Sequence, residues 1–186
     1  MAAGHNYYRF TGWRFAALLL VFLAYTAWFV TIGPFGELTR LEDYAYLQGR
    51  GFYTGAEAVA AIDSLTLDGR RLKYTELGFD LIYMVLQTWV FEALIAFGLV
   101  GMGLMRSRWR WLLLAPMGFL LFDFLEDASL ALVLATSSEI IGSFEGVFTL
   151  MKFVFFVPLI FLSLGIAAAG IVARALRKRK GGPEPD

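Results

Sequence analysis

Four long apolar stretches alternate with shorter polar segments along the chain. The apolar stretches cover residues 15–33, 79–104, 111–136 and 146–173. Each is long enough, as an α-helix, to cross the roughly 30 Å hydrocarbon core of a bilayer. The pattern therefore predicts an all-α fold, a polytopic integral membrane four-helix bundle that forms a single domain over residues 1–186.

The polar segments predict how the four spans are connected. Residues 36–77 form the one sizeable loop, and residues 55–65 within it combine helix formers with a one-sided apolar stripe. We expect a short extracytoplasmic helix there, lying on the membrane surface or capping the bundle. Asp68 and Gly69 indicate a turn before the second span. Two short connections and a basic tail complete the chain: 105–110, 137–145 and 174–186.

The distribution of basic residues predicts the orientation in the membrane. Ten Lys and Arg lie in the N-terminal tail, the 105–110 turn and the C-terminal tail, against five in the 36–77 loop and none in 137–145. Cytoplasmic loops of membrane proteins carry an excess of Lys and Arg. Both termini are therefore predicted to be cytoplasmic, with the large loop outside.

Composition agrees with a membrane protein and excludes several kinds of chemistry. Hydrophobic residues make up 59% of the chain and charged residues only 17%. The chain has no cysteine, which excludes disulfides, thiolate zinc sites and cysteine nucleophiles, and its single histidine is His5 in the N-terminal tail. No phosphate-binding loop or nucleic-acid module is present, so nucleic acid is not an expected partner. Whether the chain holds a metal or a cofactor stays open at this point.

The third apolar stretch holds three carboxyl groups near its middle. Asp123, Glu126 and Asp127 are spaced i, i+3, i+4 and share one face of a helix. A charged group at that depth costs on the order of 3 kcal/mol, so this face has to meet protein, water or a cation. The spacing predicts a buried polar site.

Residues of the other spans fall at similar depths. Counted at 1.5 Å per residue, Tyr25 of the first span and Glu92 of the second lie near the level of Asp123. Thr88 lies one turn before Glu92 and shares its face. We expect these side chains to meet near the middle of the membrane.

Lys152 of the fourth span falls near the level of Glu126 and Asp127, and we expect it to pair with one of them. The membrane interior would then hold four carboxyl groups and only one ammonium, that of Lys152. The four are Glu92, Asp123, Glu126 and Asp127. Protonation, water, a bound cation or a basic group of another chain would relieve the excess charge. Protonated acids that only specify helix packing are a further alternative.

Small residues and prolines within the spans bear on packing. The three glycines of the second span have a spacing that superficially resembles a nucleotide-binding motif. They lie inside a span rather than after a strand, so they predict close helix packing instead. Prolines within a span predict kinks. The small residues are Gly98, Gly101 and Gly103 in the second span and Ser163, Gly165, Ala167, Ala169 and Gly170 in the fourth; the prolines are Pro116 and Pro158.

The segment Phe122-Asp123-Phe124-Leu125-Glu126-Asp127, together with Asp68 to Tyr74 and Asp80 to Tyr83, resembles a group of uncharacterised small bacterial membrane proteins. These have four spans and an F-D-x-L-E-N type motif in the third helix. The resemblance implies the bacterial inner membrane as the location and brings no activity with it. Asp127 stands where the motif has an amide, which adds a charge.

Three functions are compatible with these features. The first is a membrane accessory or binding protein without an enzymatic step, whose acidic core supports a bound cation or assembly with another membrane subunit or a second copy. The alternative is a small proton- or cation-coupled transporter. The third is a membrane-embedded lipid-modifying enzyme, for which the paired acids supply acid–base groups but no nucleophile or metal-ligand set, and hence no catalytic residue, is evident.

The predicted topology can be tested with single cysteines in this cysteine-free chain. With both termini in the cytoplasm, cysteines at Thr54 and Ser138 should react with an impermeant thiol reagent from outside, and a cysteine at Ser107 only from inside. Labelling of Ser107→Cys from outside would overturn the topology.

Overall fold

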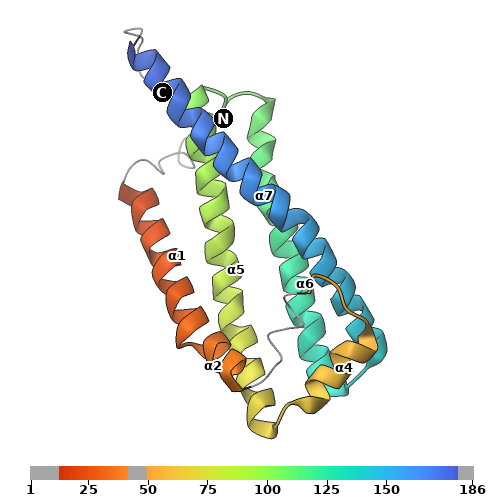
Figure 1. Cartoon of the computed structure of the whole chain (residues 1–186). Coiled ribbons are helices and arrows are strands. Elements are labelled where there is room, and N and C mark those ends of the chain that lie inside the picture. The colour runs from red at the N-terminus through yellow and green to blue at the C-terminus, as the bar shows by residue number, and fades with distance from the viewer. Residues whose placement is uncertain (1–12, 42–49, 180–186) are drawn as a thin grey trace, which may run out of the picture.

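The computed structural model describes residues 13–41 and 50–179, and none of these residues lies in a strand. The predicted all-α fold is confirmed for this part of the chain. The N-terminal tail with His5 and the end of the basic tail, 180–186, lie outside the described residues. The elements are α1 (Trp13–Thr31), α2 (Pro34–Leu41), α4 (Gly55–Ser64), α5 (Leu67–Met102), the 3-10 helix η1 (Arg108–Leu114), α6 (Ala115–Thr136) and α7 (Glu139–Arg179) (Figure 1).

Three segments are long and apolar enough to cross a membrane, judged by length and composition alone: Trp13–Arg40, Leu67–Met102 and Glu139–Arg179. They contain the first and fourth predicted spans, and the second except for its last two residues. The third predicted span, 111–136, begins in η1 and continues as α6, which has 22 residues but carries three carboxyl groups. A fourth span therefore stays a prediction.

The long helices pack around α5. Helices α5, α6 and α7 contact one another, whereas α1 packs mainly on α5 and α2. Helix α4 lies across the end of the bundle that is remote from the C-terminal end of α7, where it packs against α7 and α6 (Figure 1). The predicted capping helix is confirmed as an element that covers the bundle end.

Helix α4 is specified by its own sequence. Thr54 and Glu57 form a capping box, in which each side chain bonds to the backbone N–H of the other. The hydrogen bond from the Thr54 N–H to the carboxylate lowers the pKa of Glu57 below its ordinary value. Ala58 and Ile62 are buried and belong to an apolar cluster with residues of α5 and α6, which fixes the cap to the bundle.

Helix α5 begins twelve residues earlier than the predicted second span, at Leu67. The turn predicted at Asp68 and Gly69 is wrong. Thr66 is the N-cap, and its side chain accepts a hydrogen bond from the Gly69 N–H at 3.0 Å. Asp68 lies in the first turn, where a carboxylate favours a helix N-terminus. The extension carries polar residues of the predicted loop into the bundle.

Two further boundaries differ from the prediction. The connection predicted at residues 137–145 is shorter, because α6 ends with Ser137 in the left-handed conformation (φ 48°) and α7 begins at Glu139. Pro116 was predicted to kink a span, but it lies in the first turn of α6, where its missing N–H costs no hydrogen bond. Pro158 does lie inside α7.

Glycines bring α5 and α7 close together. A methyl group on Gly98 would collide with the backbone of Ile166, and one on Gly101 with the backbone of Gly170. The close packing predicted from these two glycines is confirmed. Gly103 has a different role, because it ends α5 in the left-handed conformation, with φ 73°. The small residues of α7 divide by face, with three buried and two exposed: Ser163, Ala167 and Gly170, against Gly165 and Ala169.

This contact predicts different effects for two glycine substitutions. Gly98→Ala should destabilise the protein by about 1–3 kcal/mol, because the added methyl group forces the α5 and α7 backbones apart. Gly165→Ala is the matched control, since nothing lies within 4 Å of its added Cβ. Equilibrium unfolding in mixed micelles measures both. Equal stability of the two variants would contradict the close contact.

Candidate functional site

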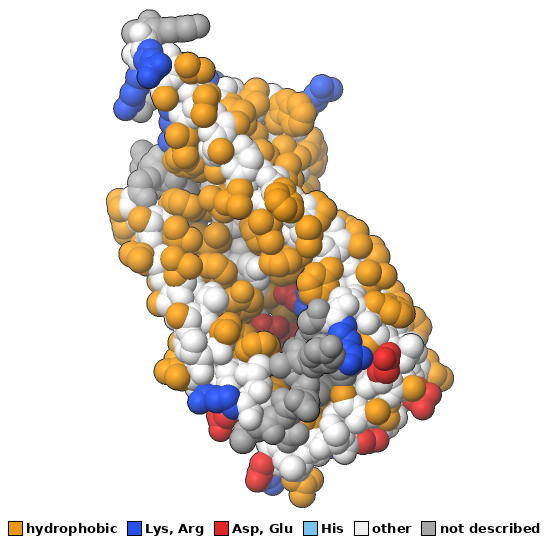
Figure 2. All heavy atoms as spheres, in the orientation of Figure 1, with side chains coloured by type: hydrophobic (Ala, Val, Ile, Leu, Met, Phe, Trp, Pro, Cys, Tyr) orange, Lys and Arg blue, Asp and Glu red, His pale blue; other side chains and the backbone are white. Residues whose placement is uncertain are grey.

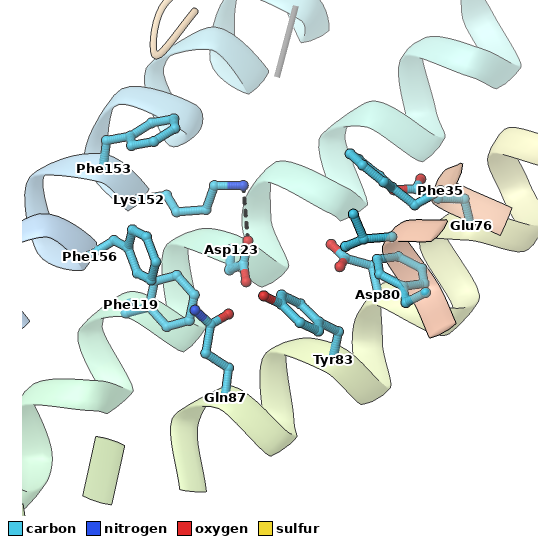
Figure 3. A pocket seen from close by; sticks show the side chains of 12 residues that line it. Phe35, Glu76, Asp80, Tyr83, Gln87, Phe119, Asp123, Lys152, Phe153 and Phe156 are labelled. Carbon is cyan, nitrogen blue, oxygen red and sulfur yellow. Dashed lines mark ion pairs between the residues drawn. The ribbon is translucent and has the colours of Figure 1, made fainter. Parts of the chain in front are cut away.

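Three charged side chains from different helices converge at one level of the bundle. Asp80 of α5, Asp123 of α6 and Lys152 of α7 each lie about 20 Å along their helix from the end nearest α4, at 1.5 Å per residue. The Lys152 ammonium lies 3.1 Å from Asp123 Oδ1 (Figure 3). It also pairs with Glu126 Oε2. One lysine thus connects α7 to two carboxylates on successive turns of α6.

These side chains border a cavity of about 340 Å³ between the helices. Figure 3 shows the Asp80 and Asp123 carboxylates and the Lys152 ammonium directed into the space between α5, α6 and α7. Figure 2 shows acidic side chains at the bottom of a hollow that is rimmed by hydrophobic ones. The lining residues are Phe29, Val30, Phe35, Glu76, Asp80, Tyr83, Gln87, Phe119, Asp123, Lys152, Phe153 and Phe156.

Aromatic packing closes the cavity toward the C-terminal end of α7. The Phe119 and Phe156 rings have centroids 5.2 Å apart, and Phe91 packs edge-on against both. Ile95 and Leu99 continue this apolar cluster along α5. Among the described residues, the buried charged side chains therefore lie in the half nearest α4.

Polar side chains connect the cavity to the α4 end. Thr149 Oγ1 donates a 2.7 Å hydrogen bond to Glu126, and the Tyr53 hydroxyl donates a 2.5 Å bond to Glu145. The Tyr53 and Thr149 hydroxyls lie 3.1 Å apart. We call the resulting chain of groups the polar column: Tyr53, Glu145, Thr149, Glu126, Lys152 and Asp123.

Tyr53 forms the outer end of the polar column, just before α4, and is 2% exposed. Its burial, and secondarily the nearby Glu145 carboxylate, raise the pKa of the Tyr53 hydroxyl above the ordinary value. The hydroxyl therefore keeps its proton and acts as a donor to Glu145. The Tyr53 backbone packs against Gly146 of α7, where a side chain would collide with it.

A second buried ion pair lies on α5. Lys73 Nζ is 2.6 Å from Glu76 Oε2, and the two side chains are 0% and 2% exposed. Glu76 also lines the cavity. This pair occupies the early part of α5 that the sequence pattern assigned to the loop.

The structure brings some of the predicted site residues together. Asp123, Glu126 and Lys152 are in direct contact, and the predicted pairing of Lys152 with Glu126 is confirmed. The second partner of Lys152 is Asp123 rather than Asp127. Asp127 is buried, and neither of its oxygens has a hydrogen-bond partner among the described residues.

The remaining predicted site residues do not join this cluster. The Tyr25 hydroxyl donates to the Phe79 carbonyl at 2.7 Å. Thr88 donates to the Met84 carbonyl of its own helix at 2.7 Å, which leaves it no proton to offer Glu92. Glu92 is half-buried, does not line the cavity and forms no ion pair or hydrogen bond with the described residues.

We call the buried and cavity-lining polar side chains of the bundle the polar core. Five of its residues were not among the site residues predicted from the sequence: Tyr53, Lys73, Glu76, Asp80 and Glu145. A periodic signal was present for those on α5, because polar residues recur every three or four positions there and share one face. This polar stripe consists of Lys73, Glu76, Asp80, Tyr83 and Gln87. The stripe was missed because its first turns were assigned to a loop.

Acids outnumber bases in the polar core. Among the described residues, six carboxyl groups are buried or line the cavity, against two lysines. The six are Glu76, Asp80, Asp123, Glu126, Asp127 and Glu145; the two are Lys73 and Lys152. No three His, Cys, Asp or Glu side chains of the described part are placed to hold a metal ion together. Asp80 forms no ion pair or hydrogen bond with described residues.

Comparison with known proteins identifies no relative. No protein-family model, curated protein or solved structure matches this chain. The function has to be argued from the geometry of the site itself.

The Lys152 contacts predict a pattern of loss and recovery in stability. Lys152→Met should cost about 3–5 kcal/mol, because it leaves two buried carboxylates without their cation. Adding Glu126→Gln or Asp123→Asn should recover part of that loss. Adding Asp127→Asn is the matched control and should recover less, since Asp127 does not contact Lys152. Equal recovery in all three double variants would argue against the specific pairing. Denaturant titration in micelles gives these values.

Proposed function

We propose that the chain is an integral membrane binding protein with four spans, in which α6 is the third. The two sides of α6 support this assignment. Asp123, Glu126 and Asp127 are buried, whereas Leu121, Phe124 and Leu132 are about half exposed on the outside. A helix with acids toward its neighbours and an apolar outer surface suits a bundle surrounded by lipid.

The charge distribution supports the proposed orientation in a bacterial inner membrane. Basic side chains gather at the end formed by η1 and the end of α7, and acidic ones at the α4 end (Figure 2). The last turn of α7 carries Arg177, Lys178 and Arg179. With the excess of positive charge inside, α4 and the half of the bundle that holds the buried charges lie toward the outer side.

The proposed activity is binding of a positively charged group in the cavity. The lining holds three carboxyl groups, of which Glu76 is paired with Lys73 and Asp123 with Lys152. The observation that carries the proposal is that the third, Asp80, forms no ion pair with the described residues. A carboxylate in a low-dielectric site attracts a proton or a cation strongly. A cation bound beside Asp80 would bring the lining close to neutrality.

The polar column supports a second candidate, a proton- or cation-coupled transporter. Its hydrogen-bonded groups reach from Tyr53 near the α4 end to the ion pair that lines the cavity. A transporter also needs an exit on the opposite side. The aromatic packing of Phe91, Phe119 and Phe156 closes that side, so binding is the function that the geometry supports better.

Cation binding can be measured by thermal unfolding in a neutral maltoside detergent. The probes are Na⁺, K⁺, Mg²⁺ and butylammonium chloride, each titrated at constant ionic strength. At least one should raise the Tm of the wild-type protein in a saturable manner, since a ligand that binds only the folded state stabilises it. Asp80→Asn should abolish that shift.

The control variant is Asp68→Asn, which removes an acid from the exposed first turn of the same helix. It should respond to cations as the wild-type protein does. If no cation gives a shift that depends on Asp80, the proposed function is wrong.

A further inference from the structure

The size of the cavity indicates the class of cation. A volume of about 340 Å³ exceeds that of one water molecule, about 30 Å³, roughly tenfold. A dehydrated inorganic ion would fill a small part of it, and divalent cations seek six or more oxygen ligands. The described residues hold no cluster of three carboxylates that meets this need. The cavity is instead in the size range of sites for small organic molecules.

The lining suits an organic ammonium group. Asp80 offers a carboxyl group that forms no ion pair with the described residues, and the Tyr83, Phe119 and Phe156 rings border the same space (Figure 3). Aromatic faces attract organic cations, and a carboxylate forms charge-assisted hydrogen bonds with an ammonium. Gln87 adds an amide that can accept or donate a hydrogen bond. Anionic ligands would face three carboxylates and are disfavoured.

The mouth of the cavity opens toward an apolar surface. Val30 of α1 both lines the cavity and is 45% exposed, which places it at the mouth. Among the described residues, helix α1 packs mainly on α5 and α2, and residues of both α1 and α7 line the cavity. Hydrophobic side chains border the hollow in Figure 2 where described residues form its edge. In a membrane this opening would face lipid tails, so a ligand that enters here carries an apolar chain.

From these observations we infer that the cavity binds the ammonium group of an amphipathic alkylammonium compound, which enters sideways between α1 and α7 with its apolar chain left toward the lipid. The inference rests on the proposed binding function and names its ligand class. The ammonium lies beside Asp80 against the aromatic wall, and the Lys152 ion pairs with Asp123 and Glu126 stay intact.

The probe for this inference is a dodecylammonium compound with a photoreactive diazirine in its chain, used with protein in maltoside micelles. Labelling should saturate, and peptide mass spectrometry should place it on the α1, α5 and α7 segments that line the cavity. Asp80→Asn should weaken the apparent affinity about tenfold or more, as loss of roughly 1.4 kcal/mol would do. Asp68→Asn should leave it unchanged.

A second variant tests the lateral entrance without touching a charge. Val30→Trp puts a large side chain at the exposed mouth, where it has room without straining the core. It should reduce labelling of the α5 and α7 segments several-fold while the circular dichroism spectrum and Tm stay those of the wild-type protein. Unchanged labelling of a folded Val30→Trp protein would overturn the lateral route.

Two comparison compounds separate the ligand class from the broader function. Dodecanol carrying the same diazirine should label the cavity segments weakly, and labelling equal to that of the ammonium probe would overturn the role of charge. Butylammonium lacks the long chain and should compete poorly. If Mg²⁺ or butylammonium stabilises the protein through Asp80 while the dodecylammonium probe does not bind, the binding function stands and the alkylammonium class is wrong. If no cation acts through Asp80, both fail.

Discussion

The bundle depends on one lysine held between two carboxylates. Lys152 pairs with Asp123 and Glu126, which occupy successive turns of α6. These contacts fix the position of α7 along the axis of α6 and its rotation about its own axis. The arrangement also offsets the desolvation cost of burying these two carboxylates. Ionised carboxyls removed from water are expensive unless a cation or hydrogen-bond donors accompany them, and one lysine here serves two of them. Thr149 supplies Glu126 with a further hydrogen bond, which continues the polar column toward the cap.

A boundary between polar and apolar packing divides the molecule and determines where the cavity lies. Toward α4, buried charges and hydroxyls lie between α5, α6 and α7, beside the apolar cluster that holds the cap. Toward the C-terminal end of α7, aromatic and aliphatic side chains pack together, and glycines let α5 and α7 approach closely. The cavity lies where these two kinds of packing meet, so it combines carboxylates with aromatic faces. A binding site for an organic cation needs both kinds of group at one place.

The loose attachment of α1 gives this site its access. Helices α5, α6 and α7 are held together by ion pairs, hydrogen bonds and close backbone contact. Helix α1 instead relies on aromatic packing, such as Phe22 and Phe29 against Tyr83, and on the Tyr25 hydrogen bond to the Phe79 carbonyl. Among the described residues this peripheral helix packs mainly on α5 and α2, and the cavity occupies the gap between α1 and α7. The proposed function uses that gap as the entrance for a ligand from the bilayer.

The sequence by itself determined the helical class, the apolar segments and the inward acidic face of α6, because each follows from periodicity within one segment. It also placed Lys152 near Glu126, since depth along two neighbouring helices can be counted. Only the tertiary structure decided which residues at one depth meet. Glu92 and Asp123 were expected together, but depth does not fix the rotation of α5, and the α5 face turned inward is that of Glu76 and Asp80. Tyr53 and Glu145 meet across 92 positions of sequence. No local pattern predicts such a contact, because it arises from the docking of the cap onto α7.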